Sequence, residues 1–111
     1  KSNKDKKAVS KHTNIGEIKI SLNTIENIAL GASRRSNGIK DTKASVEKHD
    51  ESVKIAIRVV VMPDINIPAI SEDIQNKVKK SVEESSGISV SEVNVIVDDI
   101  HSVATHRPRV E

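Results

Sequence analysis

The sequence contains no cysteine, tryptophan, tyrosine or phenylalanine, and only four glycines and three prolines among its 111 residues. The lack of cysteine excludes disulfides, thiol catalysis and cysteine-based zinc sites. Without aromatic side chains, the core must be filled by isoleucine, valine, leucine and alanine, which each bury a modest area. No apolar run is long enough to span a bilayer, and no signal-peptide pattern is present.

Charge is unevenly distributed, although the net charge is only +2. Residues 1–14 are rich in lysine and lack periodicity, whereas the body of the chain is net acidic. We predict that residues 1–14 form a flexible basic arm. Such an arm serves either as a solubilising linker or, close to a membrane, as an attachment to anionic lipid. Its lysines are Lys1, Lys4, Lys6, Lys7 and Lys11.

The clearest structural pattern runs from residue 53 to residue 82. Residues 53–61 alternate, with a β-branched residue at every odd position, which predicts a buried central strand. Pro63 and Pro68 then end the strand and start a turn. An apolar stripe with helical spacing follows, which predicts an amphipathic helix. The stripe consists of Ile67, Ile70, Ile74, Val78 and Val82.

Weaker patterns complete the chain. Ser21 or Asn23 offers an N-cap for a first helix, and Asn37-Gly38 ends that helix. Residues 48–51 form a polar hairpin loop. In chain order the other predicted elements are a short strand at 18–20, a helix at 22–35, a charged edge strand at 39–47 and a last strand at 93–97.

This β-α-β-β-α-β order predicts an α+β domain with the ferredoxin-like, split βαβ arrangement. The expected sheet has four antiparallel strands in the order 4-1-3-2, with both helices on one face. We predict a folded domain at residues 15–100 and an unassigned C-terminal tail at residues 101–111.

The open face of the predicted sheet is the candidate partner-binding surface, because it mixes apolar and charged residues. The edge strand at 39–47 is a second candidate, since it can accept a partner strand. The candidate residues of the open face are Ala56, Arg58, Val60 and Ile96.

Side chains suited to catalysis or ligand binding do not form a recognisable site. The neighbouring acidic pairs suit solvated faces, and no glycine-rich phosphate loop is present. We therefore predict no catalytic residue, no cofactor and no metal. RNA binding is a weaker alternative, because Lys54 and Arg58 can contact phosphate, but the aromatic residues on which bases stack are missing. The histidines lie in tails or loops without metal-ligand spacing: His12, His49, His101 and His106.

Several segments together resemble the alkaline shock protein family of Gram-positive bacteria. They are residues 21–46, the strand at 53–61, Asn66-Ile67-Pro68 with the helix after it, and residues 86–95. Within the family, residues 21–26 are most similar to the cytoplasmic domain of the membrane-anchor member. The loop Asn66, Ile67 and Pro68 has two interpretations, either the start of a helix or a contact with another family member.

The resemblance implies a non-enzymatic protein that self-associates at the inner face of the membrane and takes part in cell-envelope stress. We therefore expect a membrane-anchoring or scaffold domain that binds a soluble alkaline shock family protein or itself. Any membrane segment is expected upstream of Lys1. The alternative is a soluble, self-assembling member of the same family.

Overall fold

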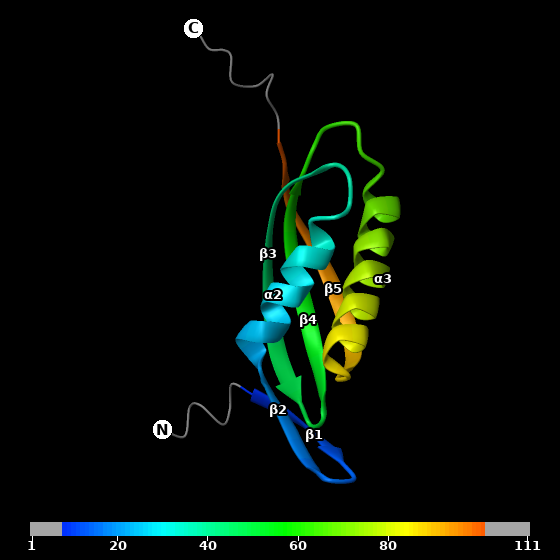
Figure 1. Cartoon of the computed structure of the whole chain (residues 1–111). Coiled ribbons are helices and arrows are strands. Elements are labelled where there is room, and N and C mark those ends of the chain that lie inside the picture. Colours follow the sequence, from blue (N-terminus) through cyan, green and yellow to red (C-terminus); the bar gives the residue numbers. More distant parts are fainter. Residues whose placement is uncertain (1–7, 102–111) are drawn as a thin grey trace, which may run out of the picture.

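The structure, a computed structural model, describes residues 8–101 (Figure 1). The first seven residues of the predicted arm and residues 102–111 of the predicted tail lie outside the described part of the chain. In chain order the elements are β1 (Ala8–Thr13), β2 (Gly16–Ser21), α2 (Leu22–Ser33), β3 (Ile39–His49), β4 (Ser52–Val61), α3 (Ile67–Ser86) and β5 (Ser89–Ile100).

Strand β4 is the centre of the main sheet. It pairs with β3 in antiparallel and with β5 in parallel orientation. The odd-numbered residues of 53–61 are each at most 1% exposed, because this face of β4 is covered by the helices. The predicted central strand is therefore confirmed, and the edge strand predicted at 39–47 is confirmed by β3.

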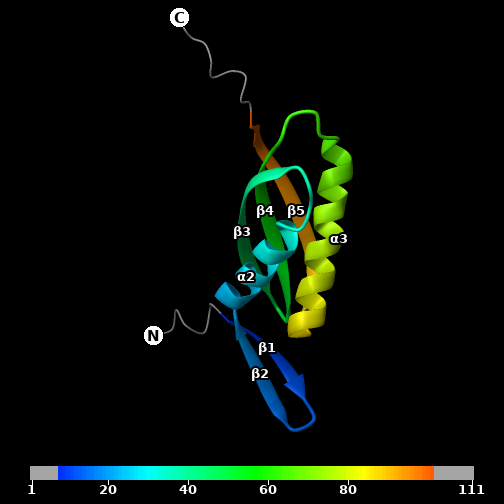
Figure 2. The same cartoon turned by 45° about the horizontal axis from the view of Figure 1, so that its top comes forward.

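Helices α2 and α3 both pack against this buried face of the sheet (Figures 1 and 2). The buried side of α2 includes Ile25 and Ala29, and that of α3 is formed by Ile70, Ile74, Val78 and Val82. The predicted helical stripe is thus confirmed for these four residues, whereas its first member, Ile67, is half-buried. The buried apolar residues between positions 8 and 101 are all valine, isoleucine or alanine, as the lack of aromatic residues requires.

Local capping fixes where the helices begin and end. The Ser21 side chain accepts a hydrogen bond from the Thr24 amide at 3.1 Å, so Ser21 is the N-cap of α2. Asn66 caps α3 in the same way through the Ala69 amide at 3.0 Å. Gly87 ends α3 with φ of 75°, in the left-handed region that glycine adopts without strain.

The predicted four-stranded antiparallel sheet is wrong. The expected first strand, β2, pairs with β1 in a separate two-stranded sheet, and β4 pairs directly with β5. The main sheet therefore has three strands in the order β3-β4-β5. β2 finds its partner across a short turn, which costs less loop-closure entropy than insertion between β4 and β5. β5 is twelve residues long and pairs along the whole of β4 without an intervening strand.

The prediction of a flexible arm is wrong for residues 8–13, which form β1. Val9 stands opposite Ile20 and is fully buried, so the base of this hairpin belongs to the core. Sequence periodicity misses β1 because only one of its residues is buried. Local turn chemistry supports it instead: the Thr13 hydroxyl donates to the Gly16 carbonyl at 3.2 Å and accepts from the Ile15 amide at 3.3 Å.

Candidate interaction surfaces

The face of the main sheet opposite the helices carries side chains in rows that cross all three strands. The strand register defines three such rows: Glu47, Lys54 and Glu92; Ser45, Ala56 and Asn94; Lys43, Arg58 and Ile96. The middle row has short side chains and the outer rows have long ones. The face is therefore hollowed across its middle, between two rows that carry charge.

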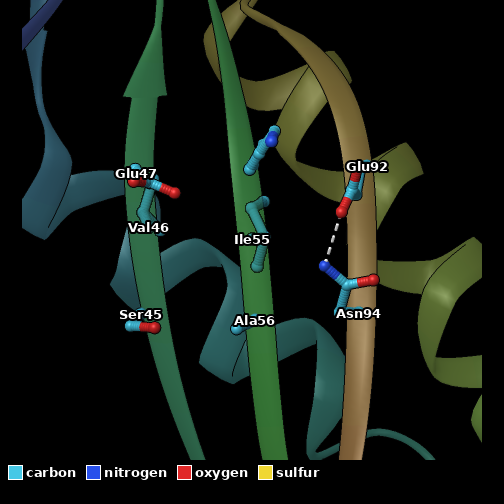
Figure 3. Close-up of a pocket in the computed structure, with 8 residues that line it drawn as sticks. Ser45, Val46, Glu47, Ile55, Ala56, Glu92 and Asn94 are labelled. Carbon is cyan, nitrogen blue, oxygen red and sulfur yellow. Dashed lines mark hydrogen bonds between the residues drawn. The ribbon is translucent and has the colours of Figure 1, made fainter.

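This hollow has a volume of about 320 Å³ (Figure 3). Figure 3 shows Ser45, Ala56 and Asn94 aligned across the three strands. Asn94 donates a hydrogen bond to Glu92 at 2.8 Å, which holds that carboxylate at one end of the hollow. Because its rim combines hydroxyl, amide and carboxylate groups with the small methyl group of Ala56, the hollow is polar.

All four residues predicted from the open face lie on this surface. Ala56 and Val60 are half-buried, Ile96 is half-buried, and Arg58 is exposed. The register places Ile96 beside Arg58, whereas Val60 stands between Asp41 and Asp99. The structure brings the four residues to one face, but their apolar atoms are partly covered and are interrupted by charge. A continuous apolar patch does not form there.

Arg58 is already engaged within the sheet. Its Nε and Nη2 atoms donate to the two carboxylate oxygens of Asp98 at 3.1 and 2.9 Å. This bidentate hydrogen bond, together with the negative charge of Asp98, raises the pKa of Arg58 above its ordinary value. A phosphate group would have to compete with Asp98 for the guanidinium, which weighs against the RNA-binding alternative.

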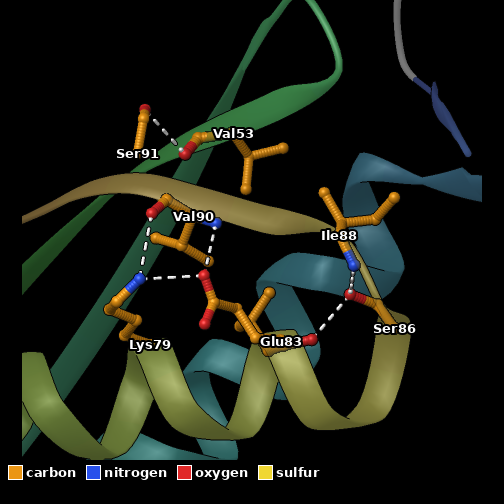
Figure 4. A network of polar contacts seen from close by, with 8 residues as sticks. Val53, Lys79, Glu83, Ser86, Ile88, Val90 and Ser91 are labelled. Atoms are coloured by element: carbon orange, nitrogen blue, oxygen red, sulfur yellow. Dashed lines mark hydrogen bonds and ion pairs between the residues drawn. The ribbon is translucent and has the colours of Figure 1, made fainter.

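The free edge of β5 is partly occupied by side chains of α3 (Figure 4). Glu83 accepts from the Val90 amide at 3.0 Å, and Lys79 donates to the Val90 carbonyl at 3.4 Å. Gln75 donates to the Val93 carbonyl at 2.9 Å. These side chains take the place of a neighbouring strand along the first half of β5. They therefore protect this edge against strand addition.

The same network should make stability depend on pH. The hydrogen bond from Lys79 at 2.9 Å, followed by that from the Val90 amide, lowers the pKa of Glu83 below its ordinary value. A carboxylate with a lowered folded-state pKa stabilises the fold above its unfolded pKa. That stabilisation is lost as the pH falls through the folded pKa.

We expect Glu83→Gln to lower the thermal midpoint at neutral pH, and the deficit to shrink as the pH falls below about 4. Thermal melts followed by circular dichroism, once at neutral pH and once at acidic pH, measure the difference in thermal midpoint between the variant and the unaltered chain. Glu84→Gln is the matched control, because Glu84 lies in the same helix but its side chain is exposed and makes no hydrogen bond within residues 8–101. A deficit that is the same at both pH values would contradict the assignment.

Strand β3 provides the other edge of the sheet. The His101 amide donates to the Val61 carbonyl, so odd-numbered residues of β4 direct their backbone groups toward β5. Even-numbered residues of β4 therefore direct their backbone groups toward β3, where they pair with odd-numbered residues. The even-numbered residues of β3 consequently direct their backbone groups away from the sheet. The backbone groups that point away from the sheet belong to Thr42, Ala44, Val46 and Lys48.

This β3 edge is largely open. Among the described residues, one side-chain hydrogen bond reaches those outward groups, from the Thr42 amide to the Asp41 carboxylate at 3.0 Å. A second hollow, of about 470 Å³, lies where α2 begins beside Val46. Leu22 and Val46 line it and are both half-buried. The β3 edge thus combines free backbone groups with a partly apolar hollow beside them.

The other residues singled out in the sequence, the loop before α3 and the histidines, have roles in local structure or show no role in the structure. Asn66, Ile67 and Pro68 form the start of α3, which supports the structural interpretation of that loop. His12 is exposed, with Glu17 at 3.9 Å and Glu51 at 3.8 Å. Within residues 8–101 no group of three or more histidine, aspartate or glutamate side chains is placed to hold a metal ion. His106 lies outside the described residues.

Two exposed isoleucines on the β1–β2 hairpin were missed by sequence reasoning. Ile15 is 98% exposed and Ile18 is 47% exposed. A signal was available for Ile15, because it follows Asn14 and precedes Gly16 in a segment with the composition of a turn, where a large apolar residue is unusual. Leu22 and Val46 were also missed, because their shared hollow depends on how α2 sits beside β3.

The fold places the chain among small α+β domains in which two helices cover one face of a three-stranded sheet. Solved structures with a similar fold include the zinc form of a MamM CTD variant, with a TM-score of 0.53 and 13% identity over 79% of this chain and 96% of that chain. The manganese form of another MamM CTD variant has a TM-score of 0.51 and 14% identity, over 69% of this chain and 96% of that chain. At such identities the similarity concerns the fold alone.

Residues 40–102 match the model of the alkaline shock protein family, which is described as having a cell envelope-related function. Because the match covers more than half of the sequence, the chain belongs to this family, and the resemblance noted in the sequence is confirmed. The match spans β3, β4, α3 and β5, and leaves out the hairpin and α2. No curated protein matches the sequence.

Proposed function

We propose that this chain is a non-catalytic binding domain that acts at the cytoplasmic face of the membrane. It captures a soluble alkaline shock family protein, or a second copy of itself, and so holds it at the cell envelope. The observation that carries this proposal is the β3 edge, where the outward backbone groups of Ala44, Val46 and Lys48 have no hydrogen-bond partner among residues 8–101 and lie beside the hollow lined by Leu22 and Val46. Family membership supplies the link to the cell envelope.

Strand addition is the binding mode that this edge suits best. An extended partner segment paired with β3 would form main-chain hydrogen bonds to the groups that now face solvent. Its inward-pointing side chains would enter the hollow and cover Leu22 and Val46. The β3 edge is better supported than the β5 edge, because Gln75, Lys79 and Glu83 already bond to the latter.

The charged side chains of the domain support a role in binding rather than catalysis. Arg58 is held by Asp98, and Asp73 accepts hydrogen bonds from Ser36 at 2.7 Å and from Lys77 at 3.0 Å. The Arg58–Asp98 pair joins β4 to β5, and the Ser36–Asp73 bond joins the segment after α2 to α3. The Lys77–Asp73 pair lies within α3, so all of these contacts serve the fold. The pKa of Asp73 is lowered, first by the Ser36 hydroxyl and then by Lys77, which keeps it ionised within this seam.

Membrane association is the second part of the proposal. No helix between residues 8 and 101 is long and apolar enough to cross a bilayer. We infer the membrane location from the resemblance of residues 21–26 to the anchor member and from the basic N-terminal sequence. Lys1, Lys4, Lys6, Lys7 and Lys11 would attract anionic lipid headgroups by about 1 kcal/mol each near the surface.

The proposal is tested by size-exclusion chromatography with light scattering, on the chain alone and mixed with a purified soluble alkaline shock family protein. A complex that forms only in the mixture is expected. An increase in the size of the chain alone with concentration would identify a second copy of itself as the captured protein, and a monomer that the soluble relative leaves unchanged would reject capture. The double variant Val60→Asp, Ile96→Asp tests the open face: loss of the complex from a folded variant would transfer the binding site from the β3 edge to that face.

A further inference from the structure

The β1–β2 hairpin projects from one end of the domain. Figures 1 and 2 show it leaving the end where α3 meets β5, opposite the end where β5 finishes. Within the part of the chain that the structure describes, its strands pair only with each other, in a sheet of two strands. An isolated two-stranded hairpin is marginally stable in water. Its position therefore depends on how its base is held.

The base is held by core packing, which gives the projection a defined direction. Val9 is fully buried and its partner Ile20 is half-buried. The side chain of Lys11 lies against Gly87, with its carbon atoms 3.4 Å from where a Cβ would stand at that glycine. From Lys11 to Lys19 the residues of the hairpin are exposed.

The tip carries apolar surface that the fold does not use. Ile15 occupies the two-residue turn and is 98% exposed, and Ile18 on β2 is 47% exposed. Lys11 stands opposite Ile18, and Lys19 is the next residue along β2. The tip thus exposes two isoleucines: Lys11 is level with Ile18, Lys19 is one residue farther from the turn, and Glu17 is one residue nearer to it.

We propose that this hairpin is a membrane-contacting finger, in which Ile15 and Ile18 enter the interfacial region of an anionic bilayer. The apolar tip would reach the boundary between headgroups and acyl chains, about 5–10 Å deep. Lys11 and Lys19 would remain at the level of the headgroups, where positive charge is favoured. This inference rests on the membrane location proposed above and adds the surface that makes the contact.

Charge favours a lipid surface over a second copy of the hairpin as the occupant. Residues 1–19 contain six lysines against Asp5 and Glu17. Two such hairpins brought together would repel, because like charges raise the energy of association. Anionic headgroups attract the same charges. Residues 20–100 are net acidic, so the hairpin end is the one that we place at the membrane.

The absence of aromatic residues allows a direct test. Ile15→Trp in the full chain provides its single intrinsic fluorophore, and Ile100→Trp provides the matched control, because Ile100 is 46% exposed at the opposite end. With vesicles of phosphatidylcholine and phosphatidylglycerol we expect a blue shift and quenching by brominated lipid for Ile15→Trp alone. Equal responses of the two variants, or no response of Ile15→Trp, would overturn the proposal. A blue shift of Ile15→Trp without vesicles that grows with protein concentration would also overturn it, in favour of a second copy.

Vesicle sedimentation adds a quantitative readout. Ile18→Asp should reduce the partition onto anionic vesicles about tenfold, whereas Ile100→Asp should leave it unchanged. Equal losses in the two variants would reject the finger. Binding that needs anionic lipid but is insensitive to Ile18→Asp would also reject the finger, yet leave lysine-driven membrane location intact. Capture of the soluble alkaline shock family protein is measured in the absence of lipid. A failure of capture is therefore distinguishable from a failure of the hairpin contact and from a failure of lysine-driven membrane binding.

Discussion

Replacing Ile57 by alanine is expected to destabilise the domain by about 2–5 kcal/mol. Ile57 is fully buried at the middle of β4, with β3 and β5 on its two sides and the helices over its face. The core around it contains only aliphatic side chains, which have no large ring to shift into a cavity. Removing three carbon atoms therefore loses apolar burial and leaves a void that the neighbours fill poorly.

Urea denaturation followed by far-ultraviolet circular dichroism measures this loss, since the chain has no tryptophan to report on unfolding. Val60→Ala is the matched control, because Val60 is in the same strand but half-buried on the open face. We expect a loss for Val60→Ala of about 1 kcal/mol or less. Similar losses in the two variants would mean that the core does not lie on the face of β4 that carries Ile57.

The sequence predicts those elements whose burial repeats along the chain. Every odd position of β4 from 53 to 61 holds a valine or isoleucine, and the apolar stripe of α3 keeps its spacing for four turns. Such patterns identify an element and its buried face without knowledge of its neighbours. Capping is equally local, which is why Asn66 could be interpreted as a helix start.

Strand partners are a different matter, because pairing is decided by competition between distant segments. Ile18 and Ile20 alternate as well in a hairpin as they would at the centre of a sheet. Nothing in β2 itself says whether β1 or β4 will be its neighbour. The outcome depends on the Thr13–Gly16 turn and on the length over which β5 matches β4.

The candidate surfaces were predictable to the same limited extent. Alternation along β4 and β5 correctly assigns Ala56, Arg58 and Ile96 to one face. It cannot show that Asp98 reaches Arg58, because the register of β5 shifts between the partners of Val59 and Val60. Nor can alternation show that α3 protects the β5 edge. That protection depends on hydrogen bonds between three side chains of α3 and the backbone of β5, a strand that comes later in the chain.

Replacing Ala44 by proline is expected to weaken capture of a soluble alkaline shock family protein by at least about tenfold. Ala44 lies in the middle of β3, and its amide points away from β4. Proline there removes a donor that an added strand would use, and its ring occupies the space of that strand. The fold should survive, because proline is tolerated in an edge strand where its missing N–H would face solvent.

Ala44→Thr is the matched control for this change, because threonine keeps the amide and favours extended backbone. If β3 accepts a partner strand, Ala44→Thr retains capture and Ala44→Pro loses it, while thermal melts show both variants folded. Equal capture by a folded Ala44→Pro variant would remove the β3 edge from consideration. Since the α3 side chains already bond to the β5 edge, the open face would then be the remaining surface of the main sheet on which a partner could dock.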